Sequence, residues 1–199
     1  LCAVDLGVDQ VKIYKFNHET GKITLVDMLR CELESAPRII KFSPDGRFAY
    51  LICELKNYIS VYSYKDGPRG PVFELVQTIS TLNEYHSKGS AACVLRFSRD
   101  WNYVLCSNAG DNSIGIFKID RETGKLEKIC ILPISGDYPK AADFFPDNRH
   151  IMALNHESNT MTIFRINYEK KYFSLWGKPL KVETPNCVLV SEIEEAPKQ

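Results

Sequence analysis

Two short landmarks recur along the chain at matched spacings, and this recurrence constrains the fold more than any other feature. A turn-bearing landmark is found as FSPDG at 42–46, FSRDW at 97–101 and FFPDN at 144–148. An apolar landmark is found as VYSY at 61–64, IFKI at 116–119 and IFRI at 163–166. From copy to copy both landmarks advance by 55 and then 47 residues, and within each copy they lie 19 residues apart. Repeats of about 40–50 residues that carry several strands are typical of β-propeller blades.

The unit at 34–64 shows which strands a repeat contains. Its runs IIKFS, RFAYLIC and YISVYSY are rich in Ile, Val, Tyr and Phe and are separated by turn residues such as Pro44-Asp45-Gly46. Such runs predict strands joined as hairpins. A fourth strand is expected after each apolar landmark, at 19–31, 71–79, 122–132 and 171–182. We therefore predict an all-β fold of four-stranded antiparallel blades.

The repeats do not coincide with the ends of the chain. IYKF at 13–16 is another copy of the apolar landmark, and its turn motif would lie before Leu1, while TPNCVLVS at 184–191 matches APRIIKFS at 36–43. We expect a single propeller region at 1–199 that is an incomplete portion, about four blades, of a longer ring whose N-terminal blades are missing. The expected parts are a partial blade at 1–33, blades at 34–83, 84–135 and 136–183, a closing strand at 184–191 and a tail at 192–199. Closure of four units as a small ring is the alternative.

Composition excludes several classes of function. The 25 basic and 25 acidic residues give a formal net charge of zero, which argues against a nucleic-acid or membrane surface because such binding needs a positive excess. No apolar run approaches the roughly 20 residues of a membrane span. The start LCAVDLGVD lacks the features of a signal peptide, and the seven cysteines form no C-x-x-C pair. We predict a cytoplasmic protein with reduced, buried cysteines, no metal site and no cofactor.

Hairpin geometry brings two sets of residues to one mouth of the ring, because the first strand of a blade begins where the second strand ends. The starts of the first strands carry Arg38, Cys93, Lys140 and Asn186. The ends of the second strands carry Asp5-Leu6, Cys53-Glu54, Asn108-Ala109 and Asn155-His156. Two cations suit a phosphate or carboxylate, and a carboxylate or imidazole can act as a general base or acid. That these groups are only solvated loop residues remains open.

Other polar positions have a structural interpretation. Four residues stand just before the third strands: Asp9, Asn57, Asn112 and Asn159. Asn and Asp tolerate left-handed backbone geometry, so we expect these residues to shape the turns. Gly21 and Gly124, in two ETGK turns, are expected to supply positive φ for the same purpose.

The quoted motifs resemble one known family. APRIIKFSPDGRFAYLICEL is similar to a segment of the seven-bladed propeller lactonases, which include propeller-type 6-phosphogluconolactonases and carboxymuconate-lactonizing enzymes. SAACVLRFSRDWNYVLCSNAGDNSIGIF, YPKAADFFPDNRHIMALNHESNTMTIF and TPNCVLV resemble later segments in the same order. The family's arginine and glutamate fall on Arg38 and Glu54. Its neighbouring histidine falls on Ile39, and two of its arginines fall on Ala109 and Lys140.

The resemblance implies hydrolysis of a sugar lactone of the 6-phosphogluconolactone type, with an anionic lactone as the small-molecule partner. Arg38 and Glu54 would be the catalytic residues, with Glu54 orienting or activating water. The substrate-binding residues would be Lys140, His156, Asn108 and Asn155, and Arg38 would share with Lys140 the holding of the anionic group. Two alternatives remain open. One is a catalytically degenerate propeller that binds a ligand or protein, and the other is a carboxymuconate-type isomerase.

Overall fold

The structure, a computed structural model, describes residues 1–67 and 70–191. In these residues the chain is almost entirely strands and turns, and a single 3-10 turn, η1 (Leu6–Val8), is the helical part. The described part contains no helix that is long and apolar enough to cross a membrane. The predicted all-β fold class is confirmed.

The strands of the described residues form successive antiparallel sheets, each built from neighbours in the sequence. The first sheet contains β1 (Cys2–Asp5), β2 (Gln10–Phe16) and β3 (Ile23–Arg30). The second contains β4 (Pro37–Phe42), β5 (Phe48–Cys53), β6 (Tyr58–Gly67) and β7 (Gly70–Ser80). The third contains β8 (Ala91–Phe97), β9 (Tyr103–Ala109), β10 (Ser113–Ile119) and β11 (Leu126–Pro133). The fourth contains β12 (Pro139–Phe144), β13 (His150–Asn155), β14 (Thr160–Asn167) and β15 (Tyr172–Leu175), with β16 (Leu180–Lys181) also paired to β14.

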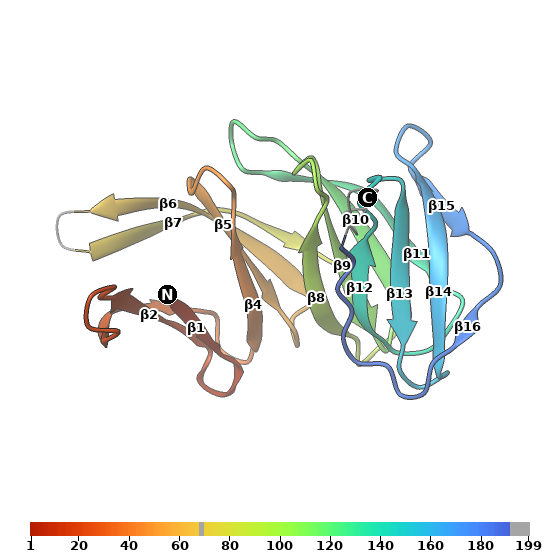
Figure 1. Cartoon of the computed structure of the whole chain (residues 1–199), viewed down its shortest axis with the longest axis horizontal. Coiled ribbons are helices and arrows are strands. Elements are labelled where there is room, and N and C mark those ends of the chain that lie inside the picture. The colour runs from red at the N-terminus through yellow and green to blue at the C-terminus, as the bar shows by residue number, and fades with distance from the viewer. Residues whose placement is uncertain (68–69, 192–199) are drawn as a thin grey trace, which may run out of the picture.

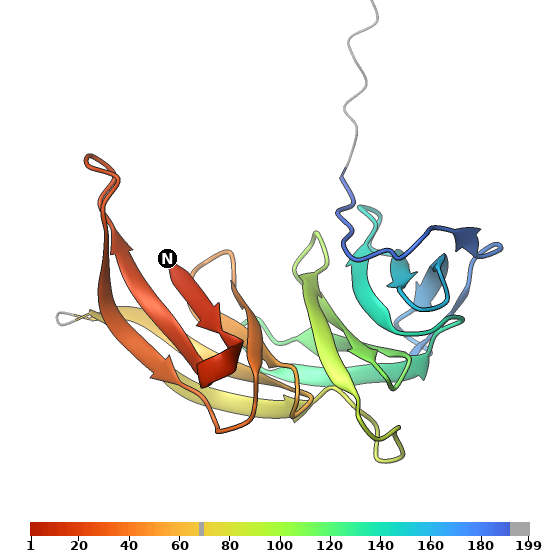
Figure 2. The ribbon, with the colours of Figure 1, turned by 90° about the horizontal axis from the view of Figure 1, so that it is seen from below.

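The sheets follow one another as blades around a common centre. Figure 1 shows the inner strands β4, β8 and β12 in the middle of the molecule, and Figure 2 shows the sheets arranged along an arc. β8 contacts both β4 and β12, so the first strands of successive blades lie side by side. This arrangement gives one mouth where the inner strands begin and an opposite rim where the Pro-Asp-Gly type turns lie.

Apolar side chains fill the spaces between successive blades. The cluster between the first and second sheets includes Val11 and Leu51. Tyr50 and Phe117 belong to the cluster between the second and third sheets, and Phe164 to the cluster between the third and fourth. Because successive strand residues point to opposite faces, each blade contributes side chains to both of its neighbours.

This alternation decides whether the first residue of each apolar landmark is buried. Ile13, Val61 and Ile116 are buried, with exposed fractions of 6%, 0% and 0%, whereas Ile163 is only half-buried. Val61 and Ile116 pack toward the blade that follows them, and Phe164 packs toward the blade before it. Ile163 therefore points away from the third sheet, to a face on which no sheet of the described residues packs. Three of the four residues are therefore buried between blades, and Ile163 is not.

The predicted turn residues have a second role. Asp9, Asn57, Asn112 and Asn159 adopt the expected left-handed conformation, with φ of 52°, 52°, 53° and 53°. Their side chains also bind the segment that enters the next blade. The Asp9 carboxylate accepts the N–H groups of Glu34 and Ala36, each at 2.8 Å, and the Asn112 side chain accepts that of Tyr138 at 2.8 Å. One residue per blade thus fixes a turn and ties two blades together.

Residues 184–191, the expected closing strand, pair with no strand of the described residues. These residues are outside any strand ladder and lie near β12, where Val190 donates its N–H to Asp143 Oδ2 at 3.3 Å. The expected tail at 192–199 lies outside the described residues.

Candidate functional site

The inner strands of the second, third and fourth sheets each begin with a β-bulge at the same place. The ladders shift between Pro37 and Ile39 in β4, between Ala92 and Val94 in β8, and between Pro139 and Ala141 in β12. The extra residues at these bulges are Arg38, Cys93 and Lys140. A bulge leaves one residue unpaired and redirects its side chain. The repeated bulge therefore explains why these three residues converge on one mouth.

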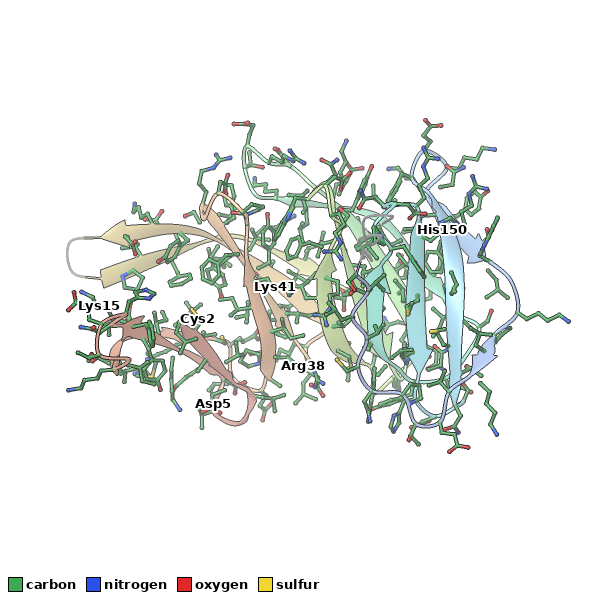
Figure 3. The ribbon with its side chains drawn as sticks, viewed as in Figure 1. Cys2, Asp5, Lys15, Arg38, Lys41 and His150 are labelled. Atoms are coloured by element: carbon green, nitrogen blue, oxygen red, sulfur yellow. The ribbon has the colours of Figure 1, made fainter. Side chains whose placement is uncertain are left out.

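Arg38 and Glu54 form an ion pair at this mouth. The Arg38 guanidinium donates from Nη1 to Glu54 Oε2, and Figure 3 shows Arg38 on the same rim as Asp5, which ends β1. Glu54 directly follows β5, and its backbone N–H donates to Ala36 O at 2.8 Å while its carbonyl accepts the N–H of Ala92 at 3.0 Å. The backbone of Glu54 is thus held between two inner strands. The side chains of Arg38 and Glu54 remain 39% and 21% exposed, so both can reach a solute.

Lys140 completes a charged group around Cys93. Burial raises the pKa of the Cys93 thiol, the cations Arg38 and Lys140 oppose this rise, and the Glu54 carboxylate adds to it. All three charged side chains therefore lie within electrostatic reach of one buried sulfur atom. The Lys140 ammonium also lies over the Tyr138 ring, 5.7 Å from its centroid. Arg38, Glu54 and Lys140, which were predicted to converge, thus all act on Cys93, a residue that was not among the predicted site residues.

His156 occupies the position in the fourth blade that Glu54 occupies in the second. Its backbone N–H donates to Tyr138 O at 3.0 Å. Its half-buried ring contacts the 184–191 segment through Nδ1 and Pro185 O, 3.3 Å apart. His156 therefore lies at the predicted mouth, with one ring nitrogen already engaged by the chain.

Asn108 and Asn155 are placed differently from what their sequence positions suggested. Both are 0% exposed. The Asn108 side-chain amide donates to Thr81 O at 2.8 Å and to Ser113 Oγ at 3.0 Å, and that of Asn155 donates to Thr160 and Thr162 at 3.1 and 3.2 Å. A residue at the end of a second strand points either to the mouth or into the sheet packing, and these two point inward. Both side chains therefore lie within the sheet packing in this structure, and not exposed at the mouth where we expected substrate-binding residues.

Two of the family positions that differ in this chain, Ala109 and Ile39, are apolar. Ala109 is 0% exposed, and Ile39 packs against the cluster between the second and third sheets. The chemistry of this mouth therefore depends on the ionic groups that remain. Within the described part of the chain, no group of three or more His, Cys, Asp or Glu residues is arranged to hold a metal ion.

Comparison with known proteins places the chain among related sequences and structures. A family model described as "Lactonase, 7-bladed beta-propeller" matches residues 1–190. An uncharacterized protein of Lactococcus lactis is 33% identical over 189 residues, covering 95% of this chain and 54% of that protein. A 6-phosphogluconolactonase of Bacillus subtilis is 26% identical over 186 residues, covering 94% of this chain and 52% of that protein.

The solved structures agree with the sequence matches. The crystal structure of a protein from Lactobacillus plantarum is similar with a TM-score of 0.82 and 27% identity, covering 92% of this chain and 52% of that one. The chain thus spans about half the length of the relatives that it matches.

Proposed function

Because the chain belongs to the seven-bladed β-propeller lactonase family, we propose that it hydrolyses a sugar lactone of the 6-phosphogluconolactone type. Membership of this family, and the partial seven-bladed propeller fold that it implies, confirm what the sequence motifs predicted. The observation that carries the proposal is the Arg38–Glu54 pair at the mouth of the inner strands, with Lys140 beside it. The name of the Bacillus subtilis relative supports the substrate class.

The chemistry requires water to attack the lactone carbonyl and the ring oxygen to leave with a proton. Glu54 would accept the proton of the attacking water, and Arg38 holds the carboxylate in a fixed orientation for this step. Arg38 and Lys140 would attract the anionic group of the substrate and stabilise negative charge that develops at the carbonyl oxygen. We include a cytoplasmic location in the proposal, which the seven free thiols support.

A binding protein without turnover is the second candidate. The observation in its favour is that the apolar residues Ile39 and Ala109 stand at two polar positions of the family pattern, with Ala109 buried and Ile39 half-buried. Such a protein would still attract anions through Arg38 and Lys140 but would lack groups that assist the reaction.

Measurement of lactone hydrolysis separates these candidates. The rate of acid release from 6-phosphogluconolactone is followed at neutral pH with the spontaneous rate subtracted, and unphosphorylated gluconolactone is the matched control. We expect turnover of both lactones, with a higher kcat/KM for the phosphorylated one because two cations lie at the mouth. Binding of the phosphorylated lactone with no hydrolysis above the spontaneous rate would contradict the hydrolase and favour the binding protein.

A further inference from the structure

The interior of the inner strands carries charged residues that the proposed reaction does not use. The residue before the aromatic residue of each turn motif is Lys41 in β4, Arg96 in β8 and Asp143 in β12. These residues hold the same repeat position on strands that lie side by side, so their side chains leave adjacent strands at the same level. Lys41 is the next-to-last residue of β4, and Figure 3 shows it away from the mouth that holds Arg38.

We call Lys41, Arg96 and Asp143 the channel cluster. Its one carboxylate, that of Asp143, already accepts hydrogen bonds from the backbone. Asp143 Oδ2 lies 3.9 Å from Arg96 Nε and also accepts the N–H of Val190 at 3.3 Å. Asp143 Oδ1 accepts the N–H of Phe144 at 2.9 Å. Arg96 Nε is buried and, among the described residues, has no hydrogen-bond partner. The two cations Lys41 and Arg96 thus have one carboxylate between them, and both of its oxygens already accept backbone N–H groups.

Burial makes this imbalance costly. Burial lowers the pKa of the Lys41 ammonium, the neighbouring Arg96 lowers it further, and Asp143 offsets only part of this effect. A buried donor without an acceptor is likewise unfavourable, because it has lost water and gained no partner. An anion placed between the two cations would remove both costs at once, since it would neutralise charge and accept the free hydrogen bonds.

We propose that Lys41 and Arg96 form a subsite for a small oxyanion inside the channel, distinct from the Arg38–Glu54 pair at its mouth. The shared chemistry is that of a phosphate or carboxylate, supplied either as a free ion or as one end of a ligand. Lys41 lies three residues beyond Arg38, about 10 Å along a strand. A ligand with an acidic group at one end could therefore bind in this subsite while its other end lies against Glu54.

Inorganic phosphate is the direct probe of the subsite. Its dissociation constant is measured by calorimetry for the wild type and for Lys41→Met, Arg96→Lys and Arg38→Ala, with Lys65→Met as the control for loss of an exposed lysine. We expect Lys41→Met to weaken phosphate binding roughly 10- to 100-fold, since a charge-assisted contact is lost. Arg96→Lys, which keeps the charge but loses Nε, should weaken it less, and Lys65→Met should leave it within about twofold. Loss of binding in Arg38→Ala with retention in Lys41→Met would place the ion at the mouth and overturn the proposal, as would no binding to the wild type.

The thermal unfolding midpoint without phosphate gives a second test that does not depend on binding strength. Because the charged form of Lys41 is disfavoured in the folded protein, Lys41→Met should unfold at the same temperature as the wild type or higher. A lower midpoint would show that Lys41 is a structural partner of Asp143 and would contradict an unfilled anion site.

The source of the oxyanion is distinguished by inhibition. If the subsite receives the phosphate of a substrate, inorganic phosphate should inhibit lactone hydrolysis competitively, and this inhibition should vanish in Lys41→Met. If it receives a free ion, phosphate should bind without competing. Because phosphate binding is measured without turnover, the absence of lactonase activity would leave this inference standing, and absence of phosphate binding would leave the proposed hydrolysis standing.

Discussion

The Arg38 guanidinium donates a hydrogen bond to the Glu54 carboxylate across the β4–β5 hairpin. Arg38 is the extra residue of a bulge and Glu54 is the first residue after β5. The group that would attract an anionic substrate and the group that would activate water thus restrain one another in the free protein. Substitution of each partner should consequently affect different kinetic constants.

Replacing Arg38 by alanine should weaken substrate binding. A lost charge-assisted contact to an anion costs about 1.5–3 kcal/mol, which is roughly a 10- to 150-fold increase in the dissociation constant. The measurement is KM for 6-phosphogluconolactone, together with direct binding of the product acid. Arg47→Ala is the matched control, because Arg47 pairs with Asp45 in the same blade but outside the mouth. An equal effect of both substitutions would mean that general charge, rather than this site, attracts the substrate.

Glu54→Gln should slow hydrolysis while leaving KM nearly unchanged. Glutamine keeps the shape of the side chain and can still accept from Arg38, but it cannot take a proton from water. Loss of a general base commonly costs about 10²–10⁴ in rate. The corrected kcat of the variant is compared with that of Glu74→Gln, which removes an exposed ion-paired carboxylate elsewhere. Unchanged kcat in Glu54→Gln would place the proton transfer on another group.

The fold could be predicted from the sequence because its information is local and repeated. The landmarks around Phe42 and Val61 set strand and turn positions in each copy, and alternation along the strands then sets which side chains are buried. The left-handed turns at Asn57 and Asn112 followed from residue type alone. Repetition made each local prediction support the others.

The site could be predicted only in part, since side-chain direction depends on features that the sequence does not display. The bulge that redirects Arg38 and Lys140 is visible only in the ladders. Asn108 follows the same pattern as Cys53-Glu54 but turns inward to Thr81 and Ser113. A signal was present for the channel cluster, since Lys41 and Arg96 interrupt otherwise apolar inner strands. The sequence alone does not show that Lys41 and Arg96 lie close together, because it does not show that β4 and β8 are neighbours.

Replacing Asn108 by alanine should destabilise the protein, because Thr81 O and Ser113 Oγ each lose a buried hydrogen-bond donor. Leaving buried polar groups unsatisfied costs about 1–3 kcal/mol each, so the free energy of unfolding should fall by at least about 1 kcal/mol. The measurement is urea unfolding at neutral pH. A rise in KM without any loss of stability would instead support the predicted role of Asn108 in substrate binding.

Asp9 should make the stability of the chain depend on pH in the acid range. The N–H groups of Ala36 and Glu34 hold the pKa of the Asp9 carboxyl below its ordinary value of 3.8. A carboxyl with a depressed pKa in the folded state stabilises the fold above its unfolded pKa, and this contribution is lost as the pH falls through the folded value. The ionised Asp9 should therefore tie the first blade to the second at neutral pH and release it in acid.

Asp9→Asn is the matched variant for this test, because asparagine stands at the same position in the other repeats, where it adopts the same φ. It keeps the turn and one acceptor oxygen but does not titrate. We expect the wild type to be more stable than Asp9→Asn at pH 7, with the difference shrinking as the pH is lowered below about 4. The free energy of unfolding in urea is measured for both proteins from pH 7 to pH 3. A difference that stays constant over this range would mean that Asp9 acts through turn geometry alone, and not through the charge of its carboxylate.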